Sequence, residues 1–173
     1  MKREAFRWVR PIPNQWVLGL ATLFGAGYVK YGPGTVGSAV GIFWFLLIAT
    51  IPSVWGYWIV VLLSLYLSAA FCGEAANRIG KKDPGSVILD EFVAIPICFM
   101  GLETMVFLHN GWILLLAGFA LFRLFDITKP WLIGCLDRIE GGWGILLDDV
   151  GAALATCACL HLLLLLEPVN SLF

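Results

Sequence analysis

Long apolar blocks separated by short polar loops constrain this chain more than any other feature. Three such blocks cover residues 35–51, 54–72 and 144–166. Each approaches the roughly 20 residues that an α-helix needs to cross the hydrocarbon core of a bilayer. Only 13% of the residues are charged, against about 25% in a soluble domain. The sequence therefore predicts an all-α, polytopic membrane bundle that forms one embedded domain over residues 1–173.

Two further blocks, residues 84–100 and 112–126, bring the expected number of transmembrane helices to about five. Asp83 followed by Pro84 is typical of an N-cap with proline at the first helical position, so a helix is expected to begin there. Residues 127–143 are polar and glycine-rich and are expected to form a loop.

The second block is expected to continue as a helix beyond residue 72. Glu74 and Arg78 follow it at i,i+4 spacing, which favours a helical ion pair. Arg78 would then lie near the end of that helix, before the polar residues Gly80 to Asp83.

The N-terminal part of the chain lacks the long apolar blocks of the predicted bundle at 35–166. Residues 1–14 are basic and are not followed by the cleavage pattern of a signal peptide, so they are expected to be a cytoplasmic segment. Residues 15–29 are apolar but short and interrupted by glycines. Together with the Gly/Pro-rich residues up to 34, they predict a re-entrant or interfacial segment.

The basic residues define an orientation. All eleven Lys and Arg residues lie in the N-terminal region, in the 73–86 loop or in the 123–143 region, and the alternating loops near 52, 101–111 and 167–173 contain none. Loops rich in Lys and Arg stay in the cytoplasm. The net charge of -1 gives no basic field for nucleic acid.

The acidic residues gather at the same end of the predicted bundle. They are Asp83, Asp90, Glu91, Asp126, Asp137, Glu140, Asp148 and Asp149. Two of the pairs, 90–91 and 148–149, lie inside apolar helices, where each charge costs at least ~2.5–3.5 kcal/mol unless a cation, a partner or water compensates it. Simpler interpretations are a pair reaching cytoplasmic water, or a favourable interaction with a helix N-terminus.

A cluster of carboxylates without His or Cys suits Mg²⁺ or Mn²⁺ rather than zinc. His109 and His161 lie away from the acids, and the five cysteines are interpreted as small buried hydrophobic residues. Arg123 and Lys129 flank Asp126 in FRLFDITKPW. They can contact a phosphate, or Arg123 and Asp126 can form a structural ion pair.

Three segments in this order carry a family resemblance: FGAGYVKYGPGTVGSAVG, DPGSVILDEFVAIPI and FRLFDITKPWLIGCLDRIEGGWGILLDDVGAA. They resemble the phosphatidylglycerophosphatase A family over about residues 24–153. The resemblance implies a Mg²⁺-dependent phosphatase of the bacterial inner membrane that converts phosphatidylglycerophosphate to phosphatidylglycerol at the cytoplasmic face, in phospholipid biosynthesis.

The acidic positions of the family match Asp83, Asp90, Glu91, Asp126, Asp137, Asp148 and Asp149 in this sequence, and its basic positions match Arg123 and Lys129. The expected site combines most of these residues with Thr35 and Lys81. Expected catalytic residues are Asp90, Glu91, Asp126 and Asp149. Expected metal ligands are Asp83, Asp90, Glu91, Asp148 and Asp149. Expected substrate contacts are Thr35, Lys81, Arg123 and Lys129.

Two other functions were compared with this hypothesis. A CDP-alcohol phosphotransferase would need an Asp-Gly…Ala-Arg acidic motif, which the sequence lacks. A cation transporter would need acids spread through the depth of the bundle, whereas the acids of this sequence collect at one end of it. Attack by metal-activated water and an aspartyl-phosphate intermediate both remain open, and the sequence gives no oligomeric state.

Overall fold

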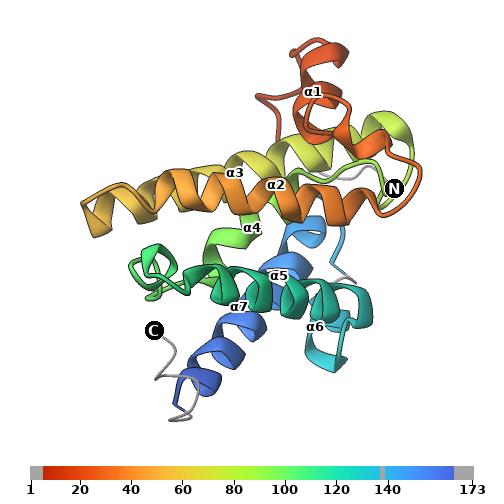
Figure 1. Cartoon of the computed structure of the whole chain (residues 1–173). Helices are drawn as coiled ribbons and strands as arrows, with labels where there is room; N and C mark the ends of the chain where they lie inside the picture. The colour runs from red at the N-terminus through yellow and green to blue at the C-terminus, as the bar shows by residue number, and fades with distance from the viewer. Residues whose placement is uncertain (1–5, 137–138, 166–173) are drawn as a thin grey trace.

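The structure is a computed structural model that describes residues 6–136 and 139–165, and its regular elements are all helical (Figure 1). The α-helices are α1 (Asn14–Ala21), α2 (Pro33–Ile48), α3 (Val54–Ile79), α4 (Leu89–Cys98), α5 (Gly111–Thr128), α6 (Trp131–Leu136) and α7 (Gly142–Leu164). Two short 3-10 helices, η1 (Ala26–Tyr28) and η2 (Met105–Phe107), lie in the connections.

Three of the described helices are long and apolar enough to cross a membrane: α3, α5 and α7. Helix α2 is apolar but has only 16 residues, and α4 has 10. At about 1.5 Å per residue, α4 covers roughly 15 Å, half of a bilayer core. The all-α class is confirmed. The expected number of about five transmembrane helices is not confirmed, because three of the described helices reach spanning length.

Two expected boundaries are wrong. The helix expected from Asp83 and Pro84 begins only at Leu89, because residues 84–87 form a turn in which the Val87 amide donates to the Pro84 carbonyl at 2.8 Å. The expected loop at 127–143 contains the short helix α6. The expected extension of α3 is confirmed, since Arg78 pairs with Glu74 at 2.8 Å within it.

The segment before α2 forms two short helices, α1 and η1, of eight and three residues. Neither is long enough to cross a bilayer. Arg78 holds the segment before α1 and the start of α1 against α3. It donates to the carbonyls of Arg10 and Ile12 and to the side chain of Asn14.

Helix α4 lies at the centre of the bundle and packs against α2, α3 and α7. Small residues on α2 allow it to pack closely against α4. A Cβ added at Gly41 would lie 2.7 Å from the Phe92 carbonyl of α4. Just beyond α4, Phe99 stacks on Phe45 of α2, with ring centroids 4.6 Å apart. Most of α4 after Glu91 is buried.

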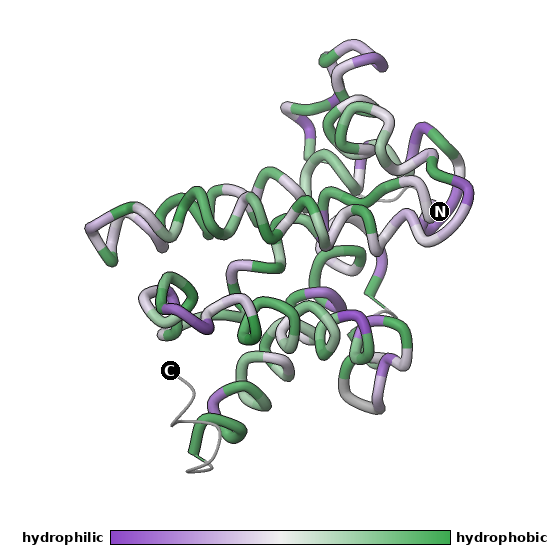
Figure 2. The backbone as a smooth tube through the Cα atoms, in the orientation of Figure 1, coloured by the Kyte–Doolittle hydropathy of each residue, from purple (hydrophilic) through white to green (hydrophobic). Residues whose placement is uncertain are grey.

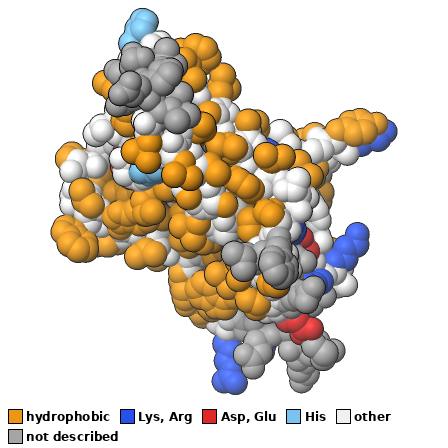
Figure 3. Space-filling view, turned by 90° about the horizontal axis from the view of Figure 1, so that it is seen from below, with side chains coloured by type: hydrophobic (Ala, Val, Ile, Leu, Met, Phe, Trp, Pro, Cys, Tyr) orange, Lys and Arg blue, Asp and Glu red, His pale blue; other side chains and the backbone are white. Residues whose placement is uncertain are grey.

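Polarity divides the bundle along its length. Hydrophilic residues gather at the end where α2 begins and α3 and α5 end, while the helices between are apolar (Figure 2). In the view from below, Lys, Arg, Asp and Glu side chains lie at the same end of a largely hydrophobic surface (Figure 3). At the opposite end, Trp55 near the start of α3 and Trp112 near the start of α5 are exposed. Tryptophan is enriched at membrane–water interfaces, so this end of the bundle is expected to lie at one of them.

Candidate active site

A small cavity at the polar end of the bundle collects carboxylates from four parts of the chain. Its volume is about 80 Å³. The acids that line it are Asp83, Asp90, Glu91, Asp126, Asp148 and Asp149, together with Lys129. Segments that are far apart in sequence, the 83–87 loop and helices α4, α5 and α7, therefore meet at one level.

The pair Asp90 and Glu91 lies in the first turn of α4. A helix that began at Pro84 would have placed Asp90 two turns inside it, but α4 begins only at Leu89. In the first turn, both carboxylates lie close to the positive end of the helix dipole. Asp90 is 4% exposed, and its Oδ1 accepts the Glu91 amide at 3.1 Å.

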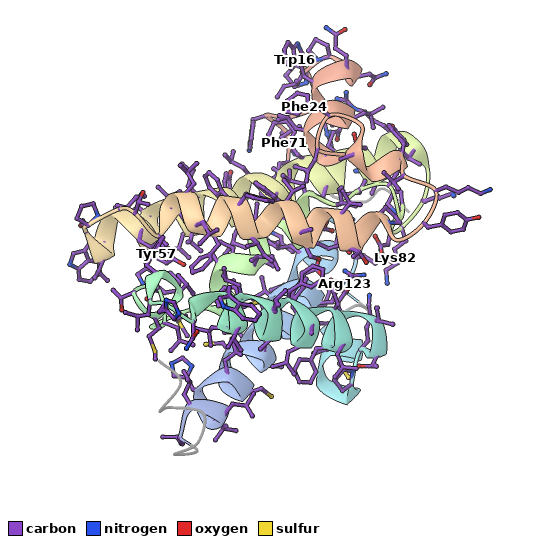
Figure 4. The ribbon with its side chains drawn as sticks, in the orientation of Figure 1. Trp16, Phe24, Tyr57, Phe71, Lys82 and Arg123 are labelled. Atoms are coloured by element: carbon purple, nitrogen blue, oxygen red, sulfur yellow. The ribbon has the colours of Figure 1, made fainter. Side chains whose placement is uncertain are left out.

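Arg123, which lies on α5, forms ion pairs with two of the acids. Its Nη1 lies 3.0 Å from Glu91 Oε1 and 2.7 Å from Asp126 Oδ2, and all three side chains are at most 15% exposed. Figure 4 shows Arg123 at the polar end, on the side of α5 that faces α2. The ion pair between Arg123 and Asp126, which was the alternative to a phosphate contact, is present, and Arg123 also pairs with Glu91 on another helix.

Lys129 provides the second cation. It follows the last residue of α5 in a left-handed conformation, with φ 41° and ψ 59°, which is uncommon for a side chain other than glycine. Its Nζ lies 2.6 Å from Asp148 Oδ2 on α7. The chain reversal at Lys129 thus directs the ammonium group into the cavity.

Asp90 and Asp149 have no ion-pair partner among the residues that the structure describes, although each is only 4% exposed. Glu91 Oε2 is also buried and lacks a hydrogen-bond partner in the same part of the chain. Burying a carboxylate without a counter-ion costs free energy, and carboxylates that line one small cavity repel one another. A cation bound in the cavity would therefore offset this cost.

The donor set fits Mg²⁺ in chemistry, because it consists of carboxylate oxygens. It is not a preformed cage: within residues 6–136 and 139–165, no three Asp, Glu, His or Cys side chains are arranged to hold one ion. Binding would require the carboxylates to move inward from their present positions.

A face of α2 formed by small residues, which was not predicted as part of the site, packs closely against Glu91. Cβ atoms added at Gly34 and Gly37 would lie 1.9 Å from Glu91 Oε1 and 2.9 Å from Glu91 Oε2. The buried Ser38 hydroxyl lies 3.4 Å from Arg123 Nη1. The spacing 34, 37, 38 and 41 of small residues follows one helix face, and that signal was available in the sequence.

Some expected site residues lie elsewhere. Thr35 and Lys81 are exposed and do not line the cavity. Asp137 lies outside the described residues. Glu140 is exposed, as expected for a loop acid.

Comparison with known proteins identifies a family. The sequence model of the family described as Phosphatidylglycerophosphatase A matches residues 19–164. Phosphatidylglycerophosphatase A from Escherichia coli is 38% identical over 151 residues, which cover 86% of this chain and 83% of that protein. The Haemophilus influenzae protein of the same name is 36% identical over 136 residues, covering 78% and 80%.

A third relative has a different name. A Bacteroides thetaiotaomicron protein, provisionally named phosphatidylinositol-3-phosphatase, is 32% identical over 137 residues, covering 76% of this chain and 82% of its own length. No solved structure gives a significant match to the chain.

Proposed function

This chain belongs to the phosphatidylglycerophosphatase A family, and we propose that it hydrolyses phosphatidylglycerophosphate to phosphatidylglycerol and phosphate with Mg²⁺. The observation that carries the proposal is the cavity in which six carboxylates meet Lys129. We place the reaction in phospholipid biosynthesis, at the cytoplasmic face of the bacterial inner membrane.

The proposed division of labour follows from the contacts. Asp90 and Asp149, which have no cationic partner in the described part of the chain, would hold Mg²⁺, with Asp83, Glu91 and Asp148 completing the set. When bound, Mg²⁺ supplies positive charge that neutralises phosphate oxygens and acidifies a water molecule. Arg123 orients Glu91 and Asp126 through its two ion pairs.

Lys129 is the cation that can leave its partner for the substrate. Its side chain is 31% exposed, against 7% for Asp148, so its ammonium group can reach a phosphate that enters from the surface. Lysine binds phosphate as a point charge. In this proposal Lys129 compensates Asp148 before substrate arrives and contacts the phosphate afterwards.

Phosphate release by purified protein tests the function directly. We expect turnover of phosphatidylglycerophosphate with Mg²⁺ and its loss in excess EDTA, restored by adding Mg²⁺ back. Phosphatidylinositol-3-phosphate serves as the comparison substrate and should be hydrolysed more slowly. Full activity in EDTA would remove the metal from the mechanism, and preference for the inositol lipid would reassign the substrate.

The orientation predicts which loops are accessible from outside. In a cysteine-free variant, an impermeant thiol reagent applied to intact cells should label His109→Cys and leave Lys81→Cys unlabelled. Both positions are exposed in the structure, so access of the reagent depends on the side of the membrane. Labelling at 81 and not at 109 would reverse the proposed topology.

A further inference from the structure

A second, larger cavity lies at the opposite end of the bundle from the carboxylates. Its volume is about 710 Å³, within the usual range for ligand sites. The end of α2, the start of α3 and the chain after α4 line it, and it is partly open to the surface. Its lining residues include Ile51, Tyr57, Trp58, Met100 and Glu103. Figure 4 shows Tyr57 near this end of α3, far from Arg123.

The cavity exists because α4 is short. Helix α4 ends at Cys98, roughly 15 Å from its first turn at the acidic level. The chain then continues as turns through Gly101 toward η2. A longer α4 would fill the space between the α2–α3 hairpin and this connection. Because α4 ends early, that space forms the cavity. Tyr57 closes its inner side, donating from its hydroxyl to the Pro96 carbonyl at 3.1 Å.

The lining is amphipathic, with one charge. Ile51, Val54 and Met100 present apolar surface, and Glu103 contributes a carboxylate whose Oε1 accepts the Gly101 amide at 3.1 Å. The sequence contains no Lys or Arg between residues 31 and 77 or between 83 and 122, and none of the lining residues is basic. The carboxylate therefore meets no protein cation in this cavity.

We propose that this cavity binds a phospholipid with an ammonium headgroup. The apolar wall would take part of an acyl chain, and the ammonium group would lie between Glu103 and the ring of Trp58. A carboxylate and an aromatic face together favour a cation through charge and through cation–π attraction. A lipid with an uncharged alcohol headgroup would leave Glu103 uncompensated, so the site should discriminate between the two.

Quenching of Trp58 by lipids with brominated chains tests the site. The signal of Trp58 is the difference between the parent protein and its Trp58→Phe variant in mixed micelles. Brominated phosphatidylethanolamine should quench it at a mole fraction about tenfold lower than brominated phosphatidylglycerol. Glu103→Gln should abolish this preference, and the control Glu140→Gln, an exposed acid at the other end, should keep it.

Two further measurements separate the site from general lipid contact and from catalysis. Ala49→Phe, which places a ring on the cavity wall, should reduce quenching by both lipids. Glu103→Gln should leave phosphatase activity unchanged, because Glu103 lies outside the acidic cavity. Equal quenching by the two lipids in the parent protein, no quenching by either, or a preference that survives Glu103→Gln would each overturn the proposal.

Discussion

Replacing Asp149 by Asn is expected to lower phosphate release from phosphatidylglycerophosphate by at least about 10²–10³-fold, in a protein that remains folded. Asp149 is 4% exposed and lines the acidic cavity without an ion-pair partner among the described residues. The amide keeps the shape of the side chain but removes the charge that attracts a cation. The same loss is expected for Asp90→Asn.

Stability should move in the opposite direction from activity. Without a bound metal, Asp149 is repelled by its neighbouring carboxylates, so Asp149→Asn should unfold at the same temperature as the parent protein or a higher one. Added Mg²⁺ should stabilise the parent, because it binds the folded state, and should stabilise the variant much less. Thermal unfolding in detergent with and without Mg²⁺ measures both effects.

The exposed acid Glu140 provides the control, and Glu140→Gln should retain near-normal turnover. The catalytic interpretation would be wrong if Asp90→Asn, Glu91→Gln, Asp148→Asn and Asp149→Asn all hydrolysed the substrate at close to the parent rate. The four acids would then be structural charges that face water.

Gly34→Ala is expected to reduce activity about 10²-fold although residue 34 carries no chemistry. The new methyl group would lie 1.9 Å from Glu91 Oε1, the atom that Arg123 contacts at 3.0 Å. Either the carboxylate leaves Arg123 or α2 moves away from α4. Misplacement of a catalytic group by about 1 Å can cost that much in rate, and overpacking costs typically ~1–3 kcal/mol in stability.

Gly85→Ala is the matched control. Gly85 lines the same cavity, but a Cβ added there meets nothing within 4 Å. Its activity and unfolding temperature should stay close to those of the parent protein. Equal activity of the two alanine variants would show that the contact between Gly34 and Glu91 does not position the carboxylate.

Local signals in the sequence predicted much of the fold. The limits of α3 follow from its apolar block, from the Glu74–Arg78 pair and from Gly80, which takes the left-handed conformation at its end. The start of α4 could not be predicted in this way. The Ile88 amide, one residue before α4, donates to the Ala21 carbonyl at 2.9 Å, and no pattern near Pro84 reveals a partner more than sixty residues away.

The acids that line the cavity had all been singled out in the sequence, but their ion pairs between helices had not been predicted. The charge of Arg123 was assigned to Asp126 or to phosphate, and its contact with Glu91 on another helix depends on how α4 and α5 pack. The pair of Lys129 and Asp148 likewise joins α5 to α7 across α6. Sequence spacing reports neighbours within a helix, whereas these contacts arise only once the helices are assembled.

The half-length of α4 has a consequence for biogenesis. Ten residues with two acids in the first turn are too short and too polar to enter a bilayer as an independent transmembrane segment. Helix α4 can reach its buried position only when α2, α3 and α7 surround it, and α7 is synthesised after the other helices described here. Nascent chains truncated before α7 should therefore contain inserted helices but no acidic cavity, so the capacity for catalysis arises only after α7 has been made.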